Sequence, residues 1–268
     1  MLTGSDVAAY LNRIGFTASV KPTLETLDAL HEAHVARVPF ENVDVLLGRP
    51  IDLGLAALEA KIVQGGRGGY CFEQNALFGA VLRAGGFTVT DLGARVRAEG
   101  AAETLPRSHM ALRVDIEGRA WLADVGFGGD GPRHPIPMDG ETMESDGEPY
   151  RIVREDPALV LQLFRGRWRD MYSFTFDPAY PSDYVMANWY TATFPRSPFV
   201  TGLTVQLSPK GARHILRGDT YTVRDRDGER TRTVTPDEAM SLLIDPFGLE
   251  LPDVDTDALR RFVAAKEA

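Results

Sequence analysis

The hydrophobic periodicity of the chain changes once, near residue 86, and this change constrains the fold most strongly. Before it, apolar residues recur at helical spacing, and Leu24, Leu27 and Val35 line one face of a predicted helix. After it, apolar and polar residues alternate or β-branched residues cluster between Gly, Pro and Asp turns, which is typical of strands. The pattern predicts an α+β fold in which helices come first, strands follow, and a mixed α/β tail ends the chain.

The expected elements follow from the same pattern. Helices are predicted over residues 5–15, 24–38, 55–63 and 72–83, with Ser5 and Thr23 as N-terminal caps. Strands that suggest a small sheet or barrel are predicted over residues 87–97, 110–116, 119–127, 150–153, 159–164 and 167–176. The tail is expected to hold a helix over 183–193, strands at 203–207, 214–216, 220–223 and 230–234, and two closing helices, the first opened by a capping box at Thr235.

Charge and cysteine content exclude several kinds of protein. The net charge is −9 and the 29 basic residues are scattered, so a nucleic-acid partner is not expected. Cys71 is the single cysteine, which excludes an intramolecular disulfide and a multi-cysteine zinc cluster and favours a cytoplasmic, reducing compartment. We expect neither a signal peptide nor a membrane span, because no segment approaches the roughly 18 apolar residues that a span needs.

Cys71 has the setting of a nucleophile. A lone cysteine is more often a small buried hydrophobic residue. Cys71, however, follows the glycine-rich segment 65–69 and opens a predicted helix, where free amides and the helix dipole favour thiolate over thiol. We expect the glycines to let a substrate carbonyl approach the backbone, and the nearby amides to stabilise an oxyanion. Cys71 is therefore the candidate nucleophile.

His109 is the candidate base, because it begins a strand whose hairpin partner carries an acid. If the hairpin turns on the two residues Glu117 and Gly118, paired positions sum to 235 and Asp124 faces Ala111. His109 lies on the same face as Ala111, so Asp124 is diagonal to His109 and within hydrogen-bond reach. A three-residue loop without a bulge would separate the two side chains. The sequence thus suggests a triad of cysteine, histidine and acid.

The other four histidines are expected to play no part in catalysis. His31 and His34 lie three residues apart on a predicted helix, but without a third ligand they are expected to be packing residues, and no metal site is predicted. His134 and His214 are expected on the solvated surface. The triad itself leaves the reaction open, since thiol proteases, transglutaminases and acyltransferases all use this arrangement.

Several segments around these residues resemble one family. Residues 67–75, Arg-Gly-Gly-Tyr-Cys-Phe-Glu-Gln-Asn, closely resemble the nucleophile motif of the arylamine N-acetyltransferases, and residues 39–43 look like that family's Pro-Phe-Glu-Asn-Leu motif, with Val43 in place of leucine. Residues 108–110 and 123–129 match where the family places its histidine and its acid with a glycine turn. Residues 188–199 resemble its interdomain helix region, and the similarity extends from Tyr10 to about Phe199.

The resemblance implies three domains and a reaction. The domains would be a helical bundle over 1–86, an antiparallel β-barrel over 87–180, and an interdomain helix with an α/β lid over 181–268, the first two sharing a papain-like Cys-His-Asp core. The reaction would be ping-pong acetyl transfer from acetyl-coenzyme A (acetyl-CoA) to an arylamine, arylhydrazine or N-hydroxyarylamine. Cys71 would be the nucleophile, His109 the base and then the acid, and Asp124 the residue that orients His109.

The resemblance also implies binding residues. Coenzyme A (CoA) would enter along a turn formed by Gly126, Phe127, Gly128 and Gly129. The acceptor would meet an apolar wall formed by Phe40, Val96 and Phe199. Acetyl-CoA would be a cosubstrate, with no tightly bound cofactor and no metal. We further expect Arg67 and Glu41 to form a structural pair near the site.

Other functions remain open on the sequence. They are an amide synthase of a biosynthetic pathway, a transferase that uses another acyl donor, a thiol hydrolase or transglutaminase, and an inert binding protein with the same fold. The oligomeric state also stays open, including a homo-oligomer.

Overall fold

The computed structural model describes residues 2–97, 105–145 and 147–263. Two helices begin the chain, α1 (Gly4–Ile14) and α2 (Leu24–Arg37). Thr3, rather than the expected Ser5, caps α1, because its side chain accepts a hydrogen bond from the amide of Asp6. Thr23 caps α2 as predicted, by accepting from the amide of Thr26.

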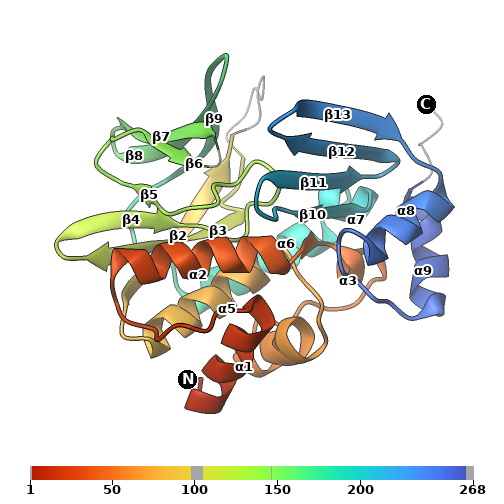
Figure 1. The fold of residues 1–268 in the computed structure, drawn as a ribbon, viewed down its shortest axis with the longest axis horizontal. Coiled ribbons are helices and arrows are strands. Elements are labelled where there is room, and N and C mark those ends of the chain that lie inside the picture. Colours follow the sequence, from red (N-terminus) through yellow and green to blue (C-terminus); the bar gives the residue numbers. More distant parts are fainter. Residues whose placement is uncertain (1, 98–104, 146, 264–268) are drawn as a thin grey trace.

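The helix expected over 55–63 consists of two segments. It begins as an α-helix, α4 (Leu55–Leu58), and continues as a π-helical turn, η1 (Glu59–Gln64). The next helix, α5 (Cys71–Ala84), begins at the cysteine, as its glycine-rich approach indicates. In Figure 1, α5 lies beside the strands β2 and β3. This contact buries Phe72 and Phe78 of α5 with Leu112 and Val114 of β3, so the helices and the barrel share one core.

Eight antiparallel strands form a nearly closed barrel in the order β5-β4-β3-β2-β9-β8-β7-β6. Their bounds are β2 (Thr88–Val96), β3 (His109–Ile116), β4 (Arg119–Ala123), β5 (Ile136–Pro137), β6 (Met143–Ser145), β7 (Glu148–Glu155), β8 (Ala158–Arg165) and β9 (Arg167–Phe174). The short strands β5 and β6 were not expected. A second core fills the barrel and includes Leu92, Ile152 and Tyr172.

The β3–β4 hairpin has the predicted register. Ile116 pairs with Arg119 and Leu112 pairs with Ala123, so paired positions sum to 235. Glu117 and Gly118 form the two-residue turn with φ angles of 50° and 80°, and the positive values match a twisted hairpin. The strand expected over 119–127 ends at Ala123 instead.

The C-terminal part packs a second sheet against two closing helices. Helices α6 (Pro181–Thr193) and α7 (Pro198–Thr201) lead into strands β10 (Thr204–Leu207), β11 (Ala212–Arg217), β12 (Thr220–Asp225) and β13 (Gly228–Thr233). The predicted capping box at Thr235 opens α8 (Pro236–Ile244), and α9 (Asp253–Leu259) with a short 3₁₀ turn, η2 (Arg260–Phe262), follows. A third core, with Leu216 and Phe247, lies between this sheet and these helices.

A short strand from the N-terminal helical part of the chain pairs with the C-terminal sheet. The two-residue strand β1 (Phe40–Glu41), which lies between helices, pairs with β10 and completes a five-stranded sheet in the order β1-β10-β11-β12-β13. A helical turn, α3 (Val43–Leu46), follows it. We call these five strands the C-terminal sheet. Strand β1 therefore belongs to a sheet whose other strands come more than 160 residues later in the sequence.

Among the described residues, no helix combines the length and apolar character needed to cross a membrane.

Candidate active site

Cys71 is the first residue of α5 and is buried, with 4% of its surface exposed. Its Sγ atom lies 3.8 Å from the carbonyl oxygen of Ser108. The side chain of Glu73 accepts a hydrogen bond of 3.0 Å from the amide of Tyr70 and so fixes the start of the helix. Amides of a first helical turn have no carbonyl partner within the helix, and the dipole there stabilises a thiolate.

The glycines before Cys71 serve backbone packing. A Cβ atom at Gly68 would collide with the carbonyl oxygen of Pro39, and a Cβ atom at Gly69 would lie 2.6 Å from the Glu73 carboxylate. The amide of Glu41 donates to the Gly69 carbonyl at 3.1 Å. These contacts explain why glycine occurs here, in addition to the expected access for a substrate carbonyl. Only residues without a Cβ atom allow the two backbone segments to come this close.

His109 and Asp124 are hydrogen-bonded, as the predicted register requires. The distance from His109 Nε2 to Asp124 Oδ2 is 2.7 Å, and both side chains are buried. Burial disfavours the imidazolium, but the charge and hydrogen bond of Asp124, together with those of Cys71, outweigh it and raise the pKa of His109 to about 10. Cys71, at the start of α5, lies close enough to His109 to help raise its pKa. A buried imidazolium that is paired with a carboxylate can stabilise a neighbouring thiolate.

Asp124 accepts three further hydrogen bonds that the sequence did not predict. Asn75 Nδ2 and the amide of Gly126 donate to Oδ1 at 2.8 Å and 3.0 Å, and the Tyr172 hydroxyl donates to Oδ2 at 2.8 Å. The turn to Gly126 also ends strand β4. Burial favours the neutral acid, yet His109, Asn75 and Tyr172 hold the pKa of Asp124 below its usual value. Asn75 is four residues from Cys71 on one helix face, which is a usable signal, whereas nothing in the sequence marks Tyr172.

His31 is buried in α2 and supports the acid from behind. Its Nε2 accepts a hydrogen bond of 3.0 Å from the Asp124 amide, and its Nδ1 lies 2.9 Å from the carbonyl oxygen of Arg133. Burial lowers the pKa of His31 to about 4, which keeps the ring neutral with its proton on Nδ1. The prediction of a packing residue is correct, and the structure adds a role in positioning Asp124.

The remaining histidines are bonded within the protein. His34 is buried between the Tyr10 hydroxyl and Gln74, as a packing residue should be. The expectation of solvated surface histidines is wrong for His134 and His214. Both are half-buried, His134 against Asp28 at 2.7 Å and His214 against the Tyr221 hydroxyl at 2.7 Å. The described ranges contain no group of three or more His, Cys, Asp or Glu side chains that could hold a metal ion.

The turn after Asp124 closes over the nucleophile. A Cβ atom at Gly126 would lie 2.8 Å from the Cα atom of Cys71, so glycine is needed there. The Phe127 ring stands edge-on to His109 with centroids 5.2 Å apart. Gly128 has a φ of 87°, in the left-handed region that glycine favours, and the amide of Gly129 donates to the side chain of Gln206. The four residues expected to meet CoA therefore form one turn directly beside the nucleophile and the base.

The three apolar residues expected to meet the acceptor fall into two groups. Phe40 and Phe199 are in contact, with ring centroids 5.7 Å apart, and Phe199 also contacts Tyr70 at 5.8 Å. Val96 lies on the barrel side, where it pairs with Tyr172, and the ring of Tyr172 is 4.8 Å from that of His109. The residues expected to form one apolar wall are thus divided between the Phe40–Phe199 contact and a valine that pairs with Tyr172.

A buried group of charges supports the segment before Cys71. The predicted pair is present, with Arg67 Nη2 2.7 Å from Glu41 Oε1. Lys61 Nζ lies 2.7 Å from Glu73 Oε1 and 2.8 Å from Asp44 Oδ2. Burial, only partly offset by Lys61, raises the pKa of Glu73 to about 7. These ion pairs link strand β1 to the start of α5.

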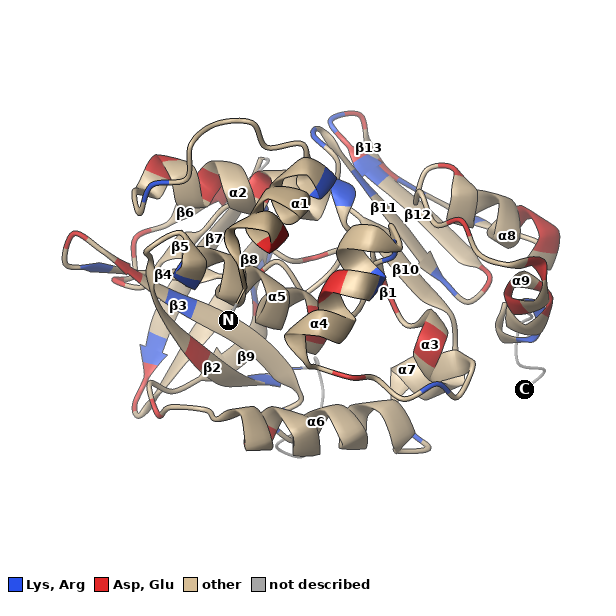
Figure 2. Cartoon of the chain, turned by 90° about the horizontal axis from the view of Figure 1, so that it is seen from below, with Lys and Arg blue, Asp and Glu red and all other residues tan. Residues whose placement is uncertain are grey.

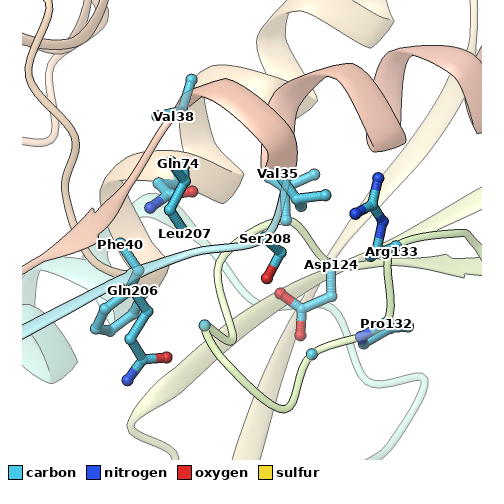
Figure 3. Close-up of a pocket in the computed structure, with 13 residues that line it drawn as sticks. Val35, Val38, Phe40, Gln74, Asp124, Pro132, Arg133, Gln206, Leu207 and Ser208 are labelled. Carbon is cyan, nitrogen blue, oxygen red and sulfur yellow. The ribbon is translucent and has the colours of Figure 1, made fainter. Parts of the chain in front are cut away.

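A small cavity is lined by Asp124 together with residues of α2 and β10. Figure 3 shows it between α2, the turn after Asp124 and strand β10. Its volume of about 20 Å³ is enough for one water molecule. Gln74, Gln206 and Ser208 supply polar atoms to its lining, and Val35 and Phe40 supply apolar ones.

Comparison with known proteins identifies the family. A family model described as N-acetyltransferase matches residues 23–256. The arylamine N-acetyltransferase of Mycolicibacterium smegmatis is 41% identical over 260 residues, covering 93% of this chain and 94% of that protein. The corresponding protein of Escherichia coli K12 is 37% identical, covering 91% and 89%.

Solved structures of the same family share the fold. The arylamine N-acetyltransferase of Salmonella typhimurium superposes with a TM-score of 0.92 at 34% identity, covering 97% of this chain and 99% of that one. The Mycobacterium marinum protein in complex with CoA superposes with a TM-score of 0.90 at 34% identity, covering 96% and 98%. With a matching family model, sequence and fold, this chain belongs to the arylamine N-acetyltransferase family.

Proposed function

We propose that this chain transfers an acetyl group from acetyl-CoA to the amine of arylamines, arylhydrazines or N-hydroxyarylamines through an acetyl thioester on Cys71. The observation that carries the proposal is the buried His109–Asp124 pair at 2.7 Å beside a cysteine at a helix N-terminus. The Mycobacterium marinum complex with CoA supports the donor. A Salmonella relative named arylamine N-acetyltransferase / N-hydroxyarylamine O-acetyltransferase, 39% identical, supports the acceptors.

The first half-reaction loads the enzyme. The Cys71 thiolate attacks the thioester carbonyl of acetyl-CoA, forming a C–S bond and an oxyanion. Amides of the first turn of α5, which have no carbonyl partner within the helix, would donate to that oxyanion. The oxyanion collapses, the bond to the CoA sulfur breaks, and the imidazolium of His109 donates its proton to that sulfur. His109 is suited to this step because its pKa of about 10 keeps the ring protonated at neutral pH.

The second half-reaction transfers the acetyl group. The amine nitrogen attacks the acetyl-Cys71 carbonyl, and neutral His109 accepts the proton that the nitrogen loses. The C–S bond then breaks, the amide leaves, and the thiolate–imidazolium pair returns. Asp124 holds Nε2 of His109, so the other ring nitrogen faces the reacting atoms throughout.

The surrounding residues complete the proposal. Gly126, Phe127, Gly128 and Gly129 would meet CoA where their turn borders Cys71. Phe40, Val96 and Phe199 would contact the aromatic ring of the acceptor. We include in the proposal a division into domains over 1–86, 87–180 and 181–268, a papain-like core in the first two, a cytoplasmic location and the absence of a tightly bound cofactor.

The test is intact-protein mass spectrometry after brief mixing with acetyl-CoA and no amine. We expect one adduct of about 42 Da that disappears when an anisidine is added, as a covalent intermediate requires. Cys71→Ala and Cys71→Ser are the matched controls and should show no adduct, since the chain has no other cysteine. An adduct only with a longer acyl-CoA would favour another donor, and hydrolysis of peptide or glutamine amides would favour a thiol hydrolase or transglutaminase.

A further inference from the structure

The loop over residues 126–131, which follows Asp124, is held by the C-terminal sheet. Three consecutive strands of that sheet each contribute one side chain to it, namely Gln206 of β10, Arg213 of β11 and Arg224 of β12. In Figure 1 this sheet stands beside the barrel, so the loop lies where the two meet. Together the three side chains bind both the backbone of the loop and its one carboxylate.

Gln206 binds the middle of the loop. It is buried, with 4% of its surface exposed, and its Oε1 accepts a hydrogen bond from the amide of Gly129. A Cβ atom at Gly128 would collide with that oxygen, and a Cβ atom at Gly129 would lie 2.5 Å from Ile215 of β11. The two glycines therefore allow the loop to lie close to the sheet. The hydrogen bond from Gly129 to Gln206 then fixes the distance between the loop and the sheet.

Arg213 binds two carbonyl groups of the same loop. Its Nη1 donates to the Gly129 carbonyl at 3.2 Å and to the Gly131 carbonyl at 2.7 Å. Its Nη2 lies 3.2 Å from the carboxylate of Glu148 on β7 of the barrel. The residue is 3% exposed, and a buried guanidinium is stable only with such partners. Arg213 thus joins the sheet, the loop and the barrel.

Arg224 binds the side chain of the loop's only acid. Its Nη1 lies 2.9 Å from Asp130 Oδ1, and Arg165 of the barrel strand β8 reaches the same oxygen at 2.9 Å. The two arginines hold the pKa of Asp130 below its usual value despite its burial. Figure 2 shows both basic and acidic residues on the C-terminal sheet, and here its basic residues face acids of the barrel side.

The loop in turn contacts the reacting groups. Gly126 packs on the Cα atom of Cys71, and Phe127 packs on the ring of His109. Building on the proposed function, we infer that Gln206, Arg213 and Arg224 are positioning residues. They hold the 126–131 loop in the shape that admits acetyl-CoA to Cys71, while Asn75, Tyr172 and His31, which lie outside the loop, hold Asp124.

This separation gives the test. Acylation of Cys71 is measured in single turnovers with two donors, acetyl-CoA and p-nitrophenyl acetate, which has no CoA moiety to place along the loop. In Gln206→Leu and in Arg224→Gln we expect the acetyl-CoA concentration for half-maximal acylation to rise about tenfold, as the loss of one buried or charged hydrogen bond predicts. The rate with p-nitrophenyl acetate should change less than about twofold, because the triad contacts remain.

Arg226→Gln is the matched control, since Arg226 follows β12 and is almost fully exposed. It should leave acylation by both donors unchanged. Arg224→Gln keeps the test decisive if Gln206→Leu does not fold, because Arg224 is more exposed. An equal loss with both donors, or no loss with either, overturns the inference. A wild-type chain that p-nitrophenyl acetate acylates and acetyl-CoA does not would overturn the proposed donor instead.

Discussion

The substitution Asp124→Asn tests the electrostatic core of the site. Asparagine has nearly the same shape, so its Oδ1 can keep the bonds to Asn75 and Gly126. Its amide group then replaces Oδ2 and faces two donors, Nε2 of His109 and the Tyr172 hydroxyl. The hydroxyl can rotate and accept, but His109 can accept only as a neutral ring in the other tautomer. The variant therefore favours neutral His109 and disfavours the thiolate–imidazolium pair.

The size of the effect follows from burial. His109 and Asp124 are almost completely enclosed, at 3% and 1% exposure, so the imidazolium loses a counter-charge that water cannot replace. Removing one partner of a buried ion pair costs about 3–5 kcal/mol. If the whole cost destabilises the reactive thiolate–imidazolium pair, acylation slows by roughly 10²- to 10⁴-fold.

The assay is the single-turnover rate of Cys71 acylation by p-nitrophenyl acetate between pH 5 and 10, with thermal unfolding in parallel. Asp139→Asn, which changes an exposed carboxylate of the barrel, is the control and should behave like wild type. In wild type the protonated state of His109 should persist to about pH 10. In the variant His109 should titrate well below that pH. An Asp124→Asn protein that acylates within threefold of wild type, with the same pH profile, would refute the assigned role of Asp124.

Three further predictions follow from buried neighbours of the site. His31 has a folded pKa of about 4 against 6.5 unfolded, so the unfolded chain takes up the proton first as pH falls. The free energy of unfolding should therefore decrease between pH 6.5 and 4, and urea titrations of His31→Gln should lack this part of the decrease. Gly126→Ala should destabilise the fold by about 1–3 kcal/mol and slow acylation, because the new methyl group overlaps the Cα atom of Cys71; unchanged kinetics would contradict this contact. Arg67→Met should lower stability by about 3 kcal/mol, because the buried Glu41 carboxylate loses the cation at 2.7 Å and keeps the Val43 amide and the more distant Lys61 at 3.9 Å. A loss below about 1 kcal/mol in chemical denaturation would mean that the pair is screened by water.

Local patterns in the sequence predicted most of the elements and the candidate nucleophile, base and acid. Period-2 alternation and a two-residue turn at Glu117 and Gly118 fix which residues face each other in the β3–β4 hairpin. That register alone brings Asp124 towards His109. The glycines before Cys71 likewise determine where α5 begins. These features depend on neighbours in sequence, so backbone sterics and side-chain periodicity suffice to predict them.

Only the tertiary structure determined the partners that these residues find at long range. Tyr172 and His31 reach Asp124 from 48 and 93 residues away, and strand β1 joins a sheet formed more than 160 residues later. Gln206 meets Gly129 in the same way. No local pattern encodes such contacts. A polar group that packing buries needs a hydrogen-bond partner. Many residues in the sequence have side chains that could serve as that partner. Only the three-dimensional packing decides which of them comes within hydrogen-bond distance.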